Sequence, residues 1–185
     1  MDLLNRKSCR ASWHEYNGGN YFVTICTKGR NHYFGEIIDD AIQLTDIGKY
    51  LKLQIENIKT HYTYADVLLS TIMPNHIHLI IHIDGDKTPY DRRSVGTRRA
   101  TSLQGNDCVI NDYMRDVANQ QGWLAVCIGG IKSSVTRYAN ENHITFGWQP
   151  RFHDHIIRNP IEMDFIVNYI ENNPLIWYRD RNNIE

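Results

Sequence analysis

The sequence predicts an α+β domain in which antiparallel strands form one layer and helices pack on it, mainly on one face. Two observations indicate this class. Runs rich in β-branched and aromatic residues recur along the chain, and segments with apolar residues at helical spacing interrupt them. The 185 residues contain no internal repeat and no low-complexity tract. We therefore expect a single domain spanning residues 1–185.

Composition narrows the class of function. The chain has 20 Lys and Arg against 21 Asp and Glu, which argues against a simple electrostatic nucleic-acid binder but allows a local basic groove. Four scattered cysteines without a Cys-x-x-Cys pair fit neither a zinc ribbon nor a disulfide framework. Polar residues break the longest apolar run, and the first residues lack an apolar signal segment. We expect a cytoplasmic protein with no membrane partner.

The first elements are predicted from residue type and capping signals. Residues 21–27 favour a strand, and 33–38 are expected to pair with it across a turn at 28–31. A helix is predicted to begin after Thr45, which suits the N-cap position. The apolar residues of this helix fall at helical spacing: Ile47, Leu51, Ile55 and Ile58.

Two further strands are predicted at 64–73 and 76–83, joined by a turn at Pro74-Asn75. The segment at about 84–107 shows neither helical nor strand periodicity and is rich in glycine, proline and basic residues. We therefore expect a mobile basic loop there. Its candidate phosphate contacts are Lys87, Arg92, Arg93, Arg98 and Arg99, although a solvated loop explains the same charges.

The remaining prediction is helix, strand, helix. A helix is expected at about 122–142, where Gly129-Gly130 either weakens it or allows close packing. A strand-like stretch follows at 144–157. The last helix has Asn159 as N-cap, Pro160 at N1 and Glu162 at N3, the pattern of a capping box, and it ends before Pro174. Its expected buried residues are Ile161, Phe165 and Ile166.

The sharpest chemical feature is His76-Ile77-His78 in a predicted strand. Side chains alternate between the two faces of a strand, so His76 and His78 lie on one face about 6.5 Å apart along it. Two imidazoles placed in this way can share a divalent metal. The alternative is a pair of packed or surface histidines. His82 lies on the same face by parity.

Tyr169 and Asn173 are candidates for the rest of such a site. They are spaced i, i+4 on the last predicted helix and so lie on one helical face. Asn173 offers an amide oxygen to a hard metal ion, and Tyr169 offers a hydroxyl. The residues alone leave two alternatives open, a core role for Tyr169 and a helix C-cap role for Asn173.

Four motifs together resemble a known family. They are Met-Pro-Asn-His-Ile-His at 73–78, Gly-Gly-Ile-Lys-Ser at 129–133, Trp-Gln-Pro-Arg-Phe-His-Asp-His-Ile-Ile-Arg-Asn at 148–159 and Tyr-Ile-Glu-Asn-Asn-Pro-Leu-Ile-Trp at 169–177. In this order they resemble the single-tyrosine HUH transposases, above all the REP-associated tyrosine transposases and the insertion-sequence 200 type. The resemblance covers almost the whole chain.

The resemblance implies a ferredoxin-like antiparallel sheet and a metal-dependent enzyme. It implies that His76 and His78 are the HUH histidines, that Asn173 is the third ligand and that Tyr169 is the nucleophile. The implied cofactor is Mg²⁺ or Mn²⁺, with no nucleotide cofactor. The implied reaction cleaves and rejoins single-stranded DNA beside a hairpin through a 5′-phosphotyrosine intermediate.

Other site roles stay open at this stage. Asp154, His155 and Arg158 belong to one of the shared motifs, which assigns them no role; they are candidates to support the metal or to contact DNA, and packing explains them equally well. Lys132 and Arg151 are candidate DNA contacts on the active face. Family members act as monomers or as homodimers, as mobile elements or as host proteins. Two rival functions are a non-catalytic single-stranded nucleic-acid binder and a hydrolase in which a histidine-bound ion activates water.

Overall fold

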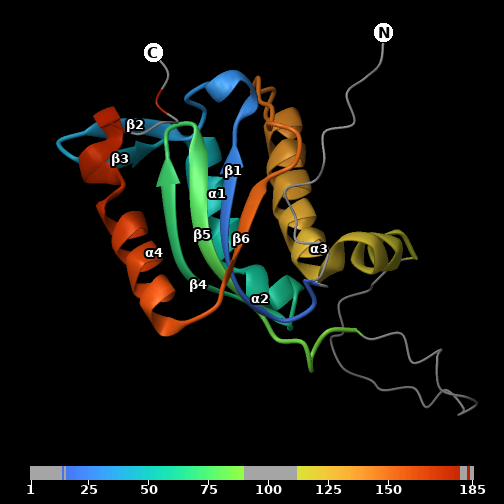
Figure 1. Ribbon diagram of the computed structural model, residues 1–185. Helices are drawn as coiled ribbons and strands as arrows, with labels where there is room; N and C mark the ends of the chain where they lie inside the picture. The colour runs from blue at the N-terminus through green and yellow to red at the C-terminus, as the bar shows by residue number, and fades with distance from the viewer. Residues whose placement is uncertain (1–13, 15, 90–111, 180–182, 184–185) are drawn as a thin grey trace, which may run out of the picture.

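The computed structural model describes residues 14, 16–89, 112–179 and 183. Its centre is a four-stranded antiparallel sheet in the order β4-β5-β1-β6 (Figure 1). The strands are β1 (Gly19–Cys26), β4 (Ala65–Met73), β5 (His76–Ile83) and β6 (His153–Ile157). The predicted fold class is confirmed, and the turn at Pro74-Asn75 lies where the sequence places it.

Three helices cover one face of this sheet and one lies on the other. The first three are α1 (Asp46–Glu56), α2 (Ile58–His61) and α3 (Asp112–Glu141), and the fourth is α4 (Pro160–Asn172) (Figure 1). Thr45 caps α1 as predicted, since its side chain accepts a hydrogen bond from the Gly48 N–H. None of the helices in the described ranges is long and apolar enough to cross a membrane.

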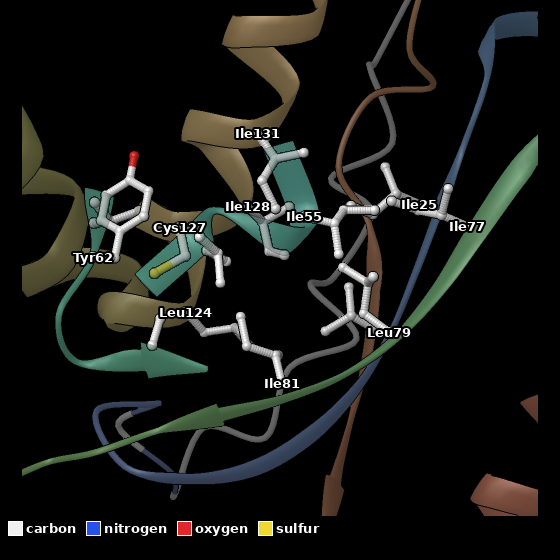
Figure 2. Packing of buried hydrophobic residues seen from close by; sticks show 14 of the residues in the cluster. Ile25, Ile55, Tyr62, Ile77, Leu79, Ile81, Leu124, Cys127, Ile128 and Ile131 are labelled. Atoms are coloured by element: carbon white, nitrogen blue, oxygen red, sulfur yellow. The ribbon is translucent and has the colours of Figure 1, made fainter. Parts of the chain in front are cut away.

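The main core lies between the sheet and α1–α3. Odd-numbered residues of β1 and β5, among them Ile25, Ile77 and Leu79, are fully buried against apolar residues of the helices (Figure 2). Even-numbered residues of the same strands face the other way. There, a smaller cluster forms between α4 and the sheet; its buried members are Ile80, Ile157 and Ile170. The strand period therefore directs His76 and His78 to the face that carries α4.

The expected pairing of 33–38 with the first strand is wrong. β2 (Gly35–Ile38) pairs instead with β3 (Ala41–Leu44) in a separate hairpin. Both edges of β1 are already occupied, by β5 on one side and β6 on the other. A short 3-10 helix, η1 (Lys28–Arg30), turns the chain away from β1 before β2 begins.

The third helix also differs from its prediction. It begins ten residues earlier than residue 122, at Asp112, and Gly122 (φ 76°, ψ 164°) breaks it into two halves. Only glycine adopts this backbone conformation readily. In the stretch 144–157, only β6 is a strand; before it, Trp148 forms a single bridge to Thr27.

The start of α4 is confirmed, and so is the packing of Ile166, but the other two residues of its predicted buried face are exposed. The Asn159 side chain accepts from the Glu162 N–H at 2.9 Å. Ile161 and Phe165, however, are 69% and 72% exposed. The stripe that contacts the sheet is Met163, Ile166, Val167 and Ile170. The helix has two apolar stripes, and the sequence does not show which one faces the sheet. The chain continues past Asn173 into η3 (Pro174–Arg179).

Candidate active site

His76 and His78 form the centre of the candidate site. Their side chains are 0% and 1% exposed, and their ring centroids are 4.6 Å apart. The Nε2 atom of His76 lies 3.1 Å from the Nε2 atom of His78. The two nitrogens therefore converge on a single point on the α4 face of the sheet.

Hydrogen bonds at the opposite ring nitrogens fix the two imidazoles. Asn75 donates its amide N–H to the Arg30 carbonyl at 3.1 Å, which leaves its Oδ1 to accept from Nδ1–H of His76 at 2.8 Å. His78 Nδ1 lies 2.9 Å from the Thr24 hydroxyl, and both groups are buried. Such partners on Nδ1 hold the Nε2 lone pair ready for a ligand.

Tyr169 reaches the same point from α4. Its hydroxyl lies 3.2 Å from Nε2 of His78, and its ring meets Phe22 edge-on at 6.0 Å. Phe22 also stacks on His78 at 5.2 Å. Tyr169 is 36% exposed, so the alternative of a core tyrosine does not describe it. Tyr169 is thus partly exposed, while its hydroxyl contacts His78.

Asn173 is buried at the end of α4, one helical turn after Tyr169. It is 1% exposed, yet among the described residues neither its amide oxygen nor its amide nitrogen has a hydrogen-bond partner. Its backbone N–H, not its side chain, takes part in capping by donating to the Ile170 carbonyl. An unpaired buried amide is unfavourable by about 1–3 kcal/mol. The helix-cap alternative therefore leaves this side chain unexplained.

The donor set fits a divalent metal ion. Protein nitrogen ligands lie about 2.0–2.1 Å from such ions, which puts two ligands of one ion about 3 Å apart. The Nε2 atoms of His76 and His78 have this separation, and the Asn173 oxygen is a hard donor that no other described residue contacts by a hydrogen bond. No cluster of three His, Cys, Asp or Glu side chains is found in the described part of the chain, so an amide is the available third ligand.

The predicted supporting residues are not all on this face. Asp154 pairs with Val23 in the sheet register and so lies on the α3 face. His155 pairs with Phe22, on the α4 face, and its Nε2 lies 2.6 Å from Glu162 Oε1. The other Glu162 oxygen accepts from the Arg158 N–H at 2.7 Å. These hydrogen bonds lower the pKa of Glu162, and the bond from the Arg158 N–H has the largest effect.

Lys132 holds the segment before β6. Its ammonium donates to the carbonyls of Gln149 and Arg151, both at 3.0 Å, and lies 5.7 Å from the centre of the Trp148 ring. Burial lowers the pKa of this lysine. Arg151 itself is exposed. The Lys132 side chain thus holds the backbone of this segment through two carbonyls.

The predicted basic loop is only partly described. Lys87 lies inside the described range, and its ammonium donates to Asp84 at 2.6 Å. Arg92, Arg93, Arg98 and Arg99 lie outside the described residues.

Four residues of the site were not predicted from the sequence. Asn75 lies in the turn directly before His76, and this adjacency in the sequence could have indicated a contact with the histidine. Thr24 and Phe22 lie on β1, more than 50 positions from His78, and no local pattern marks them. Trp177 of η3 also borders the site, with its ring 6.0 Å from that of His76.

Comparisons with known proteins define the fold and then the family. The structure of a REP-associated tyrosine transposase bound to a REP hairpin is similar with a TM-score of 0.51, over 85% of this chain and 67% of that chain, at 19% sequence identity. The fold of this chain is therefore similar to that of this transposase. The chain matches no protein-family model.

A sequence relative comes from Haemophilus influenzae and is described as an uncharacterized protein. It is 33% identical over 185 residues, which cover 97% of this chain and 93% of the relative. The chain belongs to the same family as this Haemophilus influenzae protein.

Proposed function

We propose that this protein is a metal-dependent transposase that cleaves and rejoins single-stranded DNA through a 5′-phosphotyrosine intermediate, beside a hairpin. One observation carries the proposal: the hydroxyl of the accessible Tyr169 lies 3.2 Å from Nε2 of His78, within the histidine pair. The similarity of the fold to a transposase bound to a REP hairpin supports the choice of DNA as substrate.

The ion would be held by His76, His78 and Asn173, and Mg²⁺ or Mn²⁺ suits a cellular enzyme of this kind, although histidine ligands also accept zinc or nickel. When bound, it would polarise the scissile phosphate and stabilise charge on its oxygens. All three ligands are neutral, so the site keeps the full positive charge of the ion facing the phosphate.

Tyr169 performs the covalent step. Its phenolic oxygen attacks the phosphorus, a P–O5′ phosphotyrosine ester remains on the enzyme, and the bond to O3′ breaks to leave a free 3′-OH. The phenolic proton is lost as the 3′-oxygen gains one. A free tyrosine has a pKa of about 10, so attack at neutral pH requires the phenol to be activated within the site.

The second step reverses the first with a different strand. A 3′-OH attacks the phosphotyrosine, the strand is joined, and Tyr169 regains its proton. Since the ester conserves the energy of the broken bond, joining needs no ATP. Arg151 and Arg158 are exposed on the segment leading into β6 and α4, where they are available to contact phosphates. The same role is proposed for Arg92, Arg93, Arg98 and Arg99.

The proposal is tested by a denaturing gel. The protein is incubated with a labelled library of hairpin oligonucleotides whose single-stranded flanks are randomised, with Mg²⁺, with Mn²⁺ or with a chelator. We expect an adduct that survives denaturation, requires metal and disappears in Tyr169→Phe. Tyr178→Phe is the matched control, because Tyr178 is an exposed tyrosine outside the site (69% exposed).

Two results would contradict the proposal. Metal-dependent cleavage without an adduct would favour the hydrolase, in which an ion activates water. If no library member is cleaved and His76→Gln binds DNA with the affinity of the wild type, a non-catalytic binder would be favoured.

A further inference from the structure

A single carboxylate joins the strand β6 to the helix that carries Tyr169. Only Arg158 and Asn159 separate β6 from α4. Across this corner, Glu162 Oε1 lies 2.6 Å from His155 Nε2, and Glu162 Oε2 accepts from the Arg158 N–H at 2.7 Å. Both carboxylate oxygens are therefore engaged by groups that precede the helix.

This arrangement differs from the capping box that the sequence predicts. In a capping box, the N3 carboxylate returns to the backbone N–H of the N-cap residue. Here Asn159 accepts from the Glu162 N–H, but the Glu162 carboxylate bonds one residue earlier and to a side chain of the sheet. A group that would close one helical turn instead connects the helix to β6.

The rest of α4 packs on the sheet through few buried apolar side chains. It contacts the sheet through a small cluster in which Ile170 is its one fully buried member among the described residues. Its outer face carries exposed Ile161 and Phe165. The direction of the helix axis therefore depends strongly on how its first turn is fixed.

Tyr169 lies seven residues after Glu162, which corresponds to a rise of about 10 Å along the helix. A tilt of about 10° at the first turn would displace the Tyr169 end by roughly 2 Å. Misplacement of a reacting group by 1 Å can lower a rate by about 10²-fold. The contact between Tyr169 and His78 at 3.2 Å is thus sensitive to the corner.

We propose that His155 and Glu162 are positioning residues: together they clamp the first turn of α4 to β6 and thereby place Tyr169 against the histidine pair. The catalytic consequence rests on the proposed function. This assigns a role to the His-Asp-His-Ile-Ile-Arg-Asn motif at 153–159 that neither metal binding nor nucleophilic attack explains.

The test compares His155→Ala and Glu162→Ala with His155→Gln, whose side-chain amide keeps an N–H donor. Asp164→Ala is the matched control, an exposed acidic residue on the same helix. Three quantities are measured: the single-turnover rate of adduct formation, the dissociation constant for the oligonucleotide, and hydrogen exchange of the α4 and β5 backbone amides.

We expect both alanine variants to exchange faster in α4 but not in β5, and to form the adduct about 10²-fold more slowly with an unchanged dissociation constant. His155→Gln should recover most of the rate and the protection of α4, and Asp164→Ala should match the wild type. The clamp is refuted if hydrogen exchange in α4 is the same in the alanine variants as in the wild type. It is also refuted if exchange in β5 accelerates as much as exchange in α4.

The exchange measurement separates this inference from the proposed function. If the wild type forms no adduct on any oligonucleotide, the proposed function fails, while selective loosening of α4 in His155→Ala and Glu162→Ala still supports the clamp. If adduct forms normally in both alanine variants, the positioning role is excluded and the proposed function stands.

Discussion

His78 is constrained through both of its ring nitrogens. Nδ1 meets the buried Thr24 hydroxyl at 2.9 Å, while Nε2 meets His76 at 3.1 Å and the Tyr169 hydroxyl at 3.2 Å. A proton on Nδ1, donated to Thr24, leaves Nε2 as a lone pair. In that tautomer, His78 can act as a ligand through Nε2.

Thr24→Val tests that dependence with little change in shape. Removing the hydroxyl leaves Nδ1 of the buried His78 without this partner, so we expect Mn²⁺ affinity to fall about 10- to 100-fold in a calorimetric titration. Thr71→Val is the control, since Thr71 is the neighbour of His78 on the other adjacent strand. Equal affinity in Thr24→Val and the wild type would refute the role.

At the residue scale, the sequence predicts what lies within one strand or one helical turn. The period of a strand places His76 and His78 together, and the i, i+4 spacing places Tyr169 with Asn173. Thr24 is 54 positions away from His78. Its contact depends on the register between β1 and β5, which no local pattern encodes.

At the scale of elements, the sequence allows the adjacent glycines of α3 either to weaken the helix or to permit close packing, and the structure shows one effect at each position. A Cβ at Gly130 would overlap the hydroxyl of Tyr62, whereas a Cβ at Gly129 would meet no atom within 4 Å. Gly130 therefore permits close packing of α3 on Tyr62, and Gly129 only weakens the helix.

Alanine at each position should have opposite effects. Gly129→Ala should raise the free energy of unfolding by about 0.5–1 kcal/mol, the usual gain in a helix interior. Gly130→Ala should lower it by about 1–3 kcal/mol, because Tyr62 must move. Urea denaturation measures both values, and a stabilising Gly130→Ala would contradict the packing described here.

The corner between β6 and α4 should also depend on pH. The pKa of Glu162 is lowered, chiefly by the Arg158 N–H and then by His155. A lowered carboxyl pKa contributes stability that is complete above the unfolded value of about 4.3 and is lost as the pH falls through the folded value. The protection factors of the α4 amides, which are exchange rates corrected for the intrinsic effect of pH, should therefore fall in acid, and Glu162→Gln should remove most of this dependence.

Two element-scale predictions fail for physical reasons. The strand at 33–38 has a suitable composition, but its place beside β1 is taken by β6, which comes about 115 residues later in the chain. The buried face of α4 is ambiguous because Ile161 and Phe165 form a second apolar stripe that remains exposed. Both outcomes are decided by tertiary competition.

At the scale of the whole molecule, function and stability oppose each other at Asn173. Asn173→Leu replaces an amide lacking hydrogen-bond partners among the described residues. In the presence of a metal chelator, we expect the free energy of unfolding of this variant to exceed that of the wild type by about 1–2 kcal/mol. Mn²⁺ should raise the melting temperature of the wild type, since a ligand at 100 times its Kd contributes about 2.7 kcal/mol.

The variant should gain little from the same Mn²⁺ concentration. Calorimetric melting curves with and without metal measure both effects. Destabilisation of Asn173→Leu in chelator, or an equal metal response in the two proteins, would show that Asn173 is not a ligand.

The α+β class is predictable from the sequence because the strand and helix periods are written locally along the chain. The assembled site is not, since Tyr169 and His78 are 91 positions apart. The resemblance of the motifs brings these residues together as an expectation. The geometry adds the fixed imidazoles, the partly exposed Tyr169 and an Asn173 amide that has no hydrogen-bond partner within the described ranges.

The most direct measurement is to locate the DNA on the protein. After reaction with an oligonucleotide and Mn²⁺, the denatured protein is treated with nuclease and cleaved after glutamate. The fragment 163–171 contains Tyr169 as its one tyrosine, and mass spectrometry should find a nucleotide phosphate on it. DNA cleavage with this fragment unmodified, or modification of another residue instead, would contradict the account.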